Sequence, residues 1–183
     1  MGALLNSPSC STTGRFYLVV DFIRALNLIK TRRNPTWLTA SQEKAFEELK
    51  QLIRVPNTVN IFGATGVGKT FLAWIVADEL DYIYFPHLDY LKQVEDLDRK
   101  KVILDNCQPS RHAHREALKM ISFGNMSHAI LITQQMIQDY THYIELNLTL
   151  LDQIKVRENL AQVGLFYEVK EDSSLWNLVN PHL

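Results

Sequence analysis

The chain has 183 residues, of which 46% are apolar and 21% charged, and its formal net charge is −1. This composition excludes a disordered chain, and the length suits one globular domain, or one domain with a helical appendage. Nor does a nearly neutral chain have an overall field that would attract nucleic acid. The charge is unevenly spread, because residues 1–56 carry eight basic and four acidic side chains, whereas the remainder carries eleven and sixteen.

Cysteine usage and hydropathy set the expected compartment. Cys10 and Cys107 are the only cysteines, and they form neither a disulfide framework nor a metal-ligand spacing. A reducing compartment such as the cytoplasm is therefore expected. The most apolar N-terminal run, residues 15–29, is interrupted by Asp21 and Arg24. It is a poor signal peptide and too short to span a bilayer, so no membrane association is expected.

Two helical patterns come first along the chain. Apolar residues recur every three or four positions over residues 16–29, which predicts an amphipathic helix. A second helix is predicted to begin at Thr39, which has capping-box spacing to Gln42, and to end before Pro56. The basic stretch KTRRN between them is either a solvated turn or a contact for phosphates or an acidic partner.

After these helices, short apolar segments alternate with helical ones. Strands are predicted at residues 58–62, 82–85, 100–105, 128–133 and 143–147, and helices at 69–80, 88–98, 110–121 and 148–163. This alternation predicts an α/β fold, a three-layer domain with a mainly parallel five-stranded sheet. The predicted segments are a flexible N-terminus (1–14), an N-terminal helical segment (15–56), a nucleotide-binding domain (57–163) and a short C-terminal extension (164–183).

The segment NIFGATGVGKTFLA contains a phosphate-binding pattern. Gly63, Gly68, Lys69 and Thr70 fit G-x-x-x-x-G-K-[ST] without a mismatch. Glycines let backbone N–H groups curl around a phosphate, and the following helix points its positive end at the same place. Lys69 can reach the β- and γ-phosphates, and the Thr70 hydroxyl can hold Mg²⁺. The candidate nucleotide-binding residues are Gly63, Ala64, Thr65, Gly66, Val67, Gly68, Lys69 and Thr70.

This segment resembles the Walker A motif of P-loop NTPases. The spacing of the segments after it is similar to their AAA+ and STAND branches, the latter being signal-transduction ATPases with switch-like nucleotide domains. The resemblance covers residues 57–147 and implies a P-loop NTPase domain with ATP and Mg²⁺ as ligands. Adenine is preferred over guanine because the chain lacks the N-K-x-D segment with which GTPases read their base.

A second acidic position follows 36 residues after Lys69, where the apolar run VIL ends in Asp105. The run resembles a Walker B strand, which implies that Asp105 holds Mg²⁺ through water; an Asp that ends a strand in a turn is the alternative. Many ATP-hydrolysing members place a glutamate directly after this aspartate. Asn106 stands there instead, and an amide can position a water but cannot accept its proton. Weak or slow hydrolysis is therefore expected.

The remaining candidates concern the γ-phosphate. In the resembled families a strand between the Walker A and Walker B strands ends in a polar residue near this phosphate, which makes Thr133 the candidate and Gln134 the alternate. A Thr/Gln pair that closes a buried strand is an equal alternative. The segment QQMIQDYTHY before the predicted fifth strand contains no arginine or lysine. Arg111 and Arg115 lie on the preceding helix and could act in trans, but a solvated helix face is the stronger explanation. Arg157 lies on the helix after the fifth strand and could approach the nucleotide from a short lid.

These motifs support three functions. The first is an ATP-binding switch or assembly module with weak or slow hydrolysis, whose N-terminal helices contact a protein partner or a second copy. The alternative is an active AAA+-like ATPase in DNA replication or recombination, of the helicase-loader type, which the basic N-terminal region supports modestly. A third reading, a small-molecule kinase, needs an acidic base such as Asp89 and an arginine-dense lid, and no such lid follows it.

Overall fold

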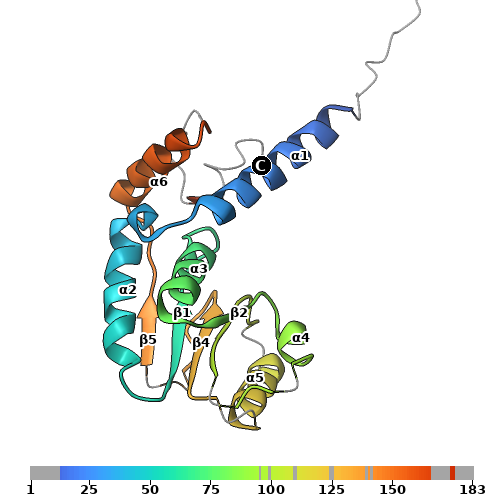
Figure 1. The fold of residues 1–183 in the computed structure, drawn as a ribbon, viewed down its shortest axis with the longest axis vertical. Coiled ribbons are helices and arrows are strands. Elements are labelled where there is room, and N and C mark those ends of the chain that lie inside the picture. Colours follow the sequence, from blue (N-terminus) through green and yellow to red (C-terminus); the bar gives the residue numbers. More distant parts are fainter. Residues whose placement is uncertain are drawn as a thin grey trace, which may run out of the picture.

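A computed structural model describes residues 13–94, 96–98, 100–108, 111–123, 126–138, 140, 142–165 and 174–175. Within these residues a five-stranded sheet carries helices on both faces, as the alternating pattern predicted (Figure 1). The strands are β1 (Thr58–Phe62), β2 (Ile83–Phe85), β3 (Lys101–Leu104), β4 (His128–Thr133) and β5 (His142–Glu145). The helices are α1 (Thr13–Arg32), α2 (Ala40–Leu52), α3 (Lys69–Leu80), α4 (Leu88–Leu91), α5 (Arg111–Phe123) and α6 (Leu150–Gln162), with a short 3-10 turn η1 (Pro35–Trp37).

The sheet is wholly parallel, and its strand order is β2-β3-β4-β1-β5. β4 is therefore inserted between β1 and β3. Phe62 of β1 pairs with Thr133 of β4, and Leu131 of β4 pairs with Leu104 of β3. The carboxyl ends of these three strands consequently lie at one edge, where open parallel sheets bind ligands. The predicted fold class is confirmed, and the predicted phosphate loop, Asp105 and Thr133 all follow strands that end at this edge.

Alternate residues of the strands build two cores, one on each face of the sheet. The core under α2 and α3 contains Val59, Ile61, Ile103, Ile130 and Ile132. The core under α5 contains Val102, Leu104, Ala129 and Leu131. Asp105 follows Ile103 by two residues, so strand alternation sends its side chain toward α3, whose first turn carries Thr70.

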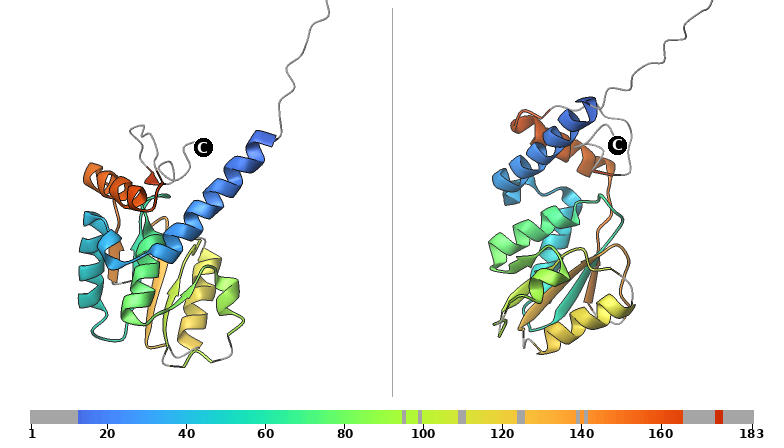
Figure 2. Two further views of the ribbon diagram at one scale, coloured as in Figure 1. Left: turned by 45° about the horizontal axis from the view of Figure 1, so that its top comes forward. Right: turned by 90° about the vertical axis from the view of Figure 1, so that its right-hand side faces the viewer.

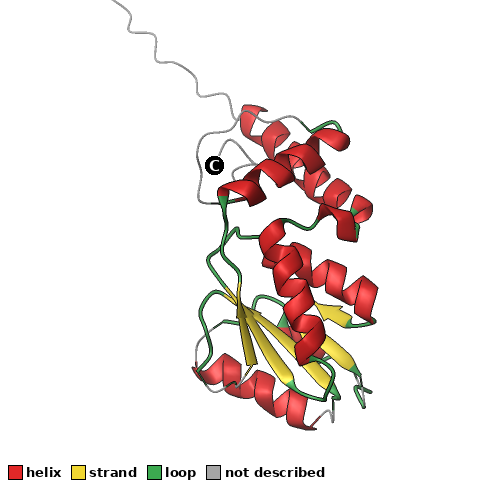
Figure 3. Ribbon diagram, turned by 90° about the vertical axis from the view of Figure 1, so that its left-hand side faces the viewer, coloured by secondary structure: helices red, strands yellow, loops and turns green. Residues whose placement is uncertain are grey.

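Two helices lie beyond the carboxyl ends of the strands rather than on a face of the sheet (Figures 2 and 3). They are α1 and α6, which contact each other through buried Ala25 and Leu160. No helix in the described part of the chain is long and apolar enough to cross a membrane. Most of the predicted flexible N-terminus (1–14) and C-terminal extension (164–183) lies outside the described residues, so the segment boundaries stay predictions.

One predicted helix is much shorter in the structure. The pattern over residues 88–98 predicted a helix of three turns, but α4 covers only Leu88–Leu91. Leu91 and Leu97 are both buried although they are six positions apart. At about 100° per residue these two side chains would lie about 120° apart on a helix, too far for one narrow apolar stripe. The chain instead leaves the helix after its first turn, and both leucines are buried.

A buried carboxylate joins α6 to α2. Asp152 accepts hydrogen bonds from the N–H and hydroxyl of Ser41 at 2.9 and 2.6 Å, and from the N–H and hydroxyl of Thr149 at 2.8 and 2.6 Å. Thr149 and Asp152 form the capping box of α6. The capping box of α2, between Thr39 and Gln42, is also present as predicted. The amino ends of the two helices are thus joined through one side chain.

Asp152→Asn is expected to lower the free energy of unfolding by about 2 kcal/mol at neutral pH. Burial opposes ionisation, but the hydrogen bonds from Ser41 and Thr149 outweigh it and lower the pKa of Asp152 from 3.8 to about 2. The ionised form of Asp152 therefore stabilises the fold fully at pH values above 3.8. This stabilisation is lost as the pH falls through the folded-state pKa of about 2. Urea unfolding at about pH 7 and about pH 3 measures the loss. The matched control is Asp89→Asn, since the Asp89 side chain is 85% exposed; an equal pH dependence in wild type and Asp152→Asn would contradict this account.

Candidate nucleotide-binding site

The loop between β1 and α3 depends on glycine at defined positions. Gly63, Gly66 and Gly68 have φ values of 155°, 83° and 88°, a region that side chains disfavour. A Cβ on Gly63 would lie 2.2 Å from the carbonyl oxygen of Leu146, so the backbone at the end of β5 leaves no room for one. Val67 is 5% exposed and belongs to the core under α3. One buried side chain thus anchors a loop whose backbone curves tightly.

Lys69 lies across this loop. Its ammonium donates to the carbonyl oxygens of Gly63 and Ala64, both at 2.7 Å. Burial lowers the pKa of Lys69, and the negative charge of Asp105 opposes that effect. Ala64 and Thr65 are exposed at the tip of the loop. A phosphate in the loop would offer the ammonium charge-assisted hydrogen bonds, which are stronger than those to two neutral carbonyls.

Asp105 is the acidic group of the site. It is 2% exposed, and its Oδ2 accepts from the Thr70 hydroxyl at 2.8 Å and from the Tyr84 hydroxyl at 2.7 Å. Its Oδ1 accepts from the N–H of Asn106 at 2.7 Å. A carboxylate beside a hydroxyl suits Mg²⁺, which prefers oxygen ligands and takes few from the protein when phosphates and waters supply the rest. Among the described residues, no group of three His, Cys, Asp or Glu side chains offers another metal site.

Asn106 has a backbone conformation that favours asparagine. Its φ is +52°, in the left-handed region that asparagine tolerates better than longer side chains do. Its Nδ2 donates to the carbonyl oxygen of Pro86 at 3.2 Å, which leaves Oδ1 as the acceptor for a water. A glutamate here would add strain of about 1 kcal/mol. The local backbone therefore gives a physical reason for the amide at this position.

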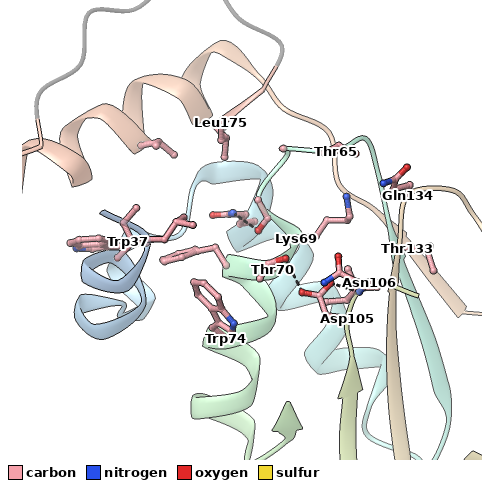
Figure 4. Close-up of a pocket in the computed structure, with 18 of the residues that line it drawn as sticks. Trp37, Thr65, Lys69, Thr70, Trp74, Asp105, Asn106, Thr133, Gln134 and Leu175 are labelled. Carbon is pink, nitrogen blue, oxygen red and sulfur yellow. Dashed lines mark hydrogen bonds between the residues drawn. The ribbon is translucent and has the colours of Figure 1, made fainter. Parts of the chain in front are cut away.

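The end of β4 presents its two polar residues differently. Thr133 is 2% exposed, and its hydroxyl accepts from Asn60 Nδ2 at 3.0 Å and donates to the carbonyl oxygen of Gln135 at 2.6 Å. Gln134 is exposed, and both residues line the same cavity (Figure 4). Because the Thr133 hydroxyl already serves two partners within the chain, the exposed Gln134 side chain is better placed to contact a ligand in the cavity.

Residues outside any motif hold these groups in place. Asn60 is fully buried in β1. Besides its bond to Thr133, its Oδ1 accepts from the N–H of Ile137 at 2.9 Å, and this bond orders the chain after β4. Gln42 donates from Nε2 to the carbonyl oxygen of Gly68 at 3.0 Å and thereby ties α2 to the phosphate loop. Asn60 could have been recognised from the sequence, because it is a polar residue inside the apolar run TVNIF. The sequence predicted Gln42 only as a helix cap, because its second contact is 26 residues away.

A cavity of about 730 Å³ opens beside the loop (Figure 4). This volume lies within the range of small-molecule sites, roughly 300–1,000 Å³. One end is polar and contains the loop with Thr70, Asp105 and Asn106. The other end is apolar, and its walls come from α1, η1, α3 and α6, including Leu26, Trp37, Phe71, Trp74, Val156 and Leu160. The sequence did not predict this apolar end, because only the packing of α1 against α6 brings its walls together.

The arginines that were weighed for the terminal phosphate do not line this cavity. Among the described residues that do, Lys69 is the only lysine or arginine. Arg115 is exposed on α5, which covers the opposite face of the sheet from α3. Arg157 is half-buried on α6 and outside the lining, and the side chain of Arg111 lies outside the described residues. The described part of the chain therefore brings no arginine of its own to the cavity.

Comparison with known proteins places the fold. No protein-family model matches the sequence, and no curated protein matches it. The replication initiator DnaA bound to AMPPCP and single-stranded DNA has a similar structure, with a TM-score of 0.51 and 16% identity over 79% of this chain and 63% of that one. The Drosophila ORC bound to DNA is similar with a TM-score of 0.51 and 12% identity, over 98% of this chain and 62% of that one. The chain therefore shares with these two structures the fold built on a parallel sheet with helices on both faces.

These similarities concern the fold alone, because the identities are low. The matched region also spans less than two thirds of the length of either similar chain. The activities of those larger proteins are therefore not established for this chain.

Proposed function

We propose that the chain binds ATP with Mg²⁺ and acts as a nucleotide-dependent switch or assembly module with weak or slow hydrolysis. The observation that carries the proposal is the meeting of the phosphate loop, Lys69 and the Thr70–Asp105 pair at one end of the cavity. Loop N–H groups and the amino end of α3 would bind the phosphates, and Lys69 would neutralise them. Thr70 and Asp105 would hold Mg²⁺. The similar DnaA structure is bound to AMPPCP, an ATP analogue, which supports a nucleotide as the ligand.

The switch part of the proposal rests on the apolar end of the cavity. Leu26 of α1 and Val156 of α6 line it, and both also belong to the contact between these two helices. A base or ribose in the cavity would therefore touch both helices at once and stabilise α1 against α6. A partner protein or a second copy bound through the N-terminal helices would sense that change.

Slow hydrolysis follows from Asn106 and is testable by substitution. Wild type is expected to release phosphate far more slowly than ~1 s⁻¹, which is the lower end of typical enzyme turnover numbers. Asn106→Glu is expected to raise the rate at least about tenfold, because a carboxylate can accept a proton from water where an amide cannot. Asn106→Gln is the matched control, because glutamine has the same length as glutamate and the same backbone strain at this position but lacks the carboxylate. A phosphate-release assay measures all three.

Two outcomes would contradict the hydrolysis account. Equal rates for Asn106→Glu and Asn106→Gln would show that the missing carboxylate does not limit turnover. Wild-type turnover at ordinary ATPase rates, abolished by Lys69→Ala, would replace slow hydrolysis with efficient catalysis.

The alternative is an active AAA+-like ATPase in DNA replication or recombination, of the helicase-loader type. It is favoured by the two similar structures, both of which are bound to DNA. The basic stretch of this chain supports it less, because Arg33 pairs with Asp78 at 2.7 Å and the ammonium of Lys30 lies 5.6 Å from the Trp74 ring. Salt-dependent DNA binding that stimulates phosphate release would select this alternative, and absence of DNA binding at low salt would remove it.

A further inference from the structure

Tyr84 forms a hydrogen bond to the carboxylate of Asp105, the group that the proposed function assigns to Mg²⁺. Its hydroxyl donates to Oδ2 of Asp105 at 2.7 Å, and the same oxygen accepts from Thr70 at 2.8 Å. Oδ1 accepts from the N–H of Asn106 at 2.7 Å. A carboxylate has about four acceptor positions, so donors from the chain itself already take three of them.

The two hydroxyls on Oδ2 differ in what they offer a metal ion. Thr70 lines the cavity, and while its proton is donated to Asp105 its oxygen keeps lone pairs that can coordinate a cation. Tyr84 is not among the described residues that line the cavity and reaches Asp105 from the side of β2. Its bond therefore takes an acceptor position and supplies no metal ligand in return.

Packing holds the Tyr84 hydroxyl at this position. Strand alternation directs its side chain to the α3 face, where its ring meets Trp74 edge-on with centroids 6.4 Å apart and an interplanar angle of 73°. A tyrosine hydroxyl ordinarily has a pKa of about 10, so it remains a donor under physiological conditions.

We propose that Tyr84 is a positioning residue that weakens the grip of Asp105 on Mg²⁺ by competing with metal-bound water for Oδ2. This inference rests on the proposed function. It predicts that the metal contributes less to nucleotide affinity than an unencumbered aspartate would allow. It also makes Tyr84 a link between the metal position and Trp74 on α3, because full engagement of Asp105 requires the Tyr84 bond to lengthen or break.

The test compares ATP dissociation constants with excess Mg²⁺ and with EDTA, measured by calorimetry on the full chain. The ratio of the EDTA value to the Mg²⁺ value reports the contribution of the metal. Tyr84→Phe keeps the ring and its contact with Trp74, and it is expected to raise this ratio about three- to tenfold, the effect of removing one competing hydrogen bond. The EDTA value should not change. Tyr82→Phe is the matched control, because Tyr82 is 5% exposed and its hydroxyl is buried without contacting Asp105.

Each other result overturns the inference in a recognisable way. An unchanged or lower ratio in Tyr84→Phe shows that Tyr84 supports the fold or helps Asp105 to hold the metal. An equal rise in Tyr82→Phe shows a general effect of losing a buried hydroxyl. Wild type that binds ATP equally with Mg²⁺ and EDTA removes the metal role of Asp105, and with it the inference. Wild type that binds no ATP in either condition overturns the proposed function itself.

Discussion

Lys69→Ala is expected to weaken ATP binding about 100-fold. The ammonium lies inside the phosphate loop, 2.7 Å from the carbonyl oxygens of Gly63 and Ala64, and is the only lysine or arginine among the described residues of the cavity wall. Losing its charge-assisted bonds to phosphate would cost about 3 kcal/mol. Calorimetry with ATP and Mg²⁺ measures the dissociation constant, and the thermal shift caused by ATP gives an independent value.

The stability of the free chain separates lost binding from lost folding. Among the described residues, the Lys69 ammonium donates hydrogen bonds only to two neutral carbonyls, so the unliganded variant should unfold within about 1 kcal/mol of wild type. Lys119→Ala is the matched control, because Lys119 is exposed on α5, across the sheet from the loop. Light scattering with ATP and Mg²⁺ should then show any nucleotide-driven assembly in wild type and Lys119→Ala but not in Lys69→Ala. Unchanged ATP affinity in Lys69→Ala would show that the nucleotide does not occupy this loop.

Gly63→Ala is expected to lower the free energy of unfolding by about 3 kcal/mol or more. Its Cβ would meet the carbonyl oxygen of Leu146 at 2.2 Å, and a backbone atom at the end of β5 cannot move aside as a flexible side chain could. The N–H of Leu146 also donates to the carbonyl oxygen of Phe62 at 2.8 Å, so relief of the clash would disturb the pairing of β1 with β5. Urea unfolding measures the loss.

Gly164→Ala separates steric clash from backbone strain. Gly164 also has a positive φ, +77°, but a Cβ there would meet no atom of the described residues within 4 Å. This variant should therefore lose only about 1 kcal/mol, the cost of a left-handed conformation for alanine. A similar loss in both variants would show that β5 yields and that the contact with Leu146 does not require glycine at position 63.

Much of the fold could be predicted from the sequence because its signals are local. The capping box of Thr39 and Gln42 correctly placed the start of α2, since a cap depends only on residues three apart. Apolar runs predicted all five strands, and their alternation with helices predicted that the sheet is parallel, as the structure has it. The failure over residues 88–98 has the opposite cause. Leu91 and Leu97 are buried by distant partners, and burial of both outweighed a weak helical pattern.

The sequence by itself determined the phosphate-loop pattern, the acidic residue at the end of β3 and the asparagine after it, because each depends on residue type and short spacing. Tertiary structure alone decided which side chains meet there. It brought the hydroxyl of Tyr84 to Asp105, turned Thr133 toward Asn60 and left Gln134 exposed. It also closed an apolar cavity with α1 and α6, which are more than a hundred residues apart. Such contacts arise from strand order and helix packing, which no local pattern encodes.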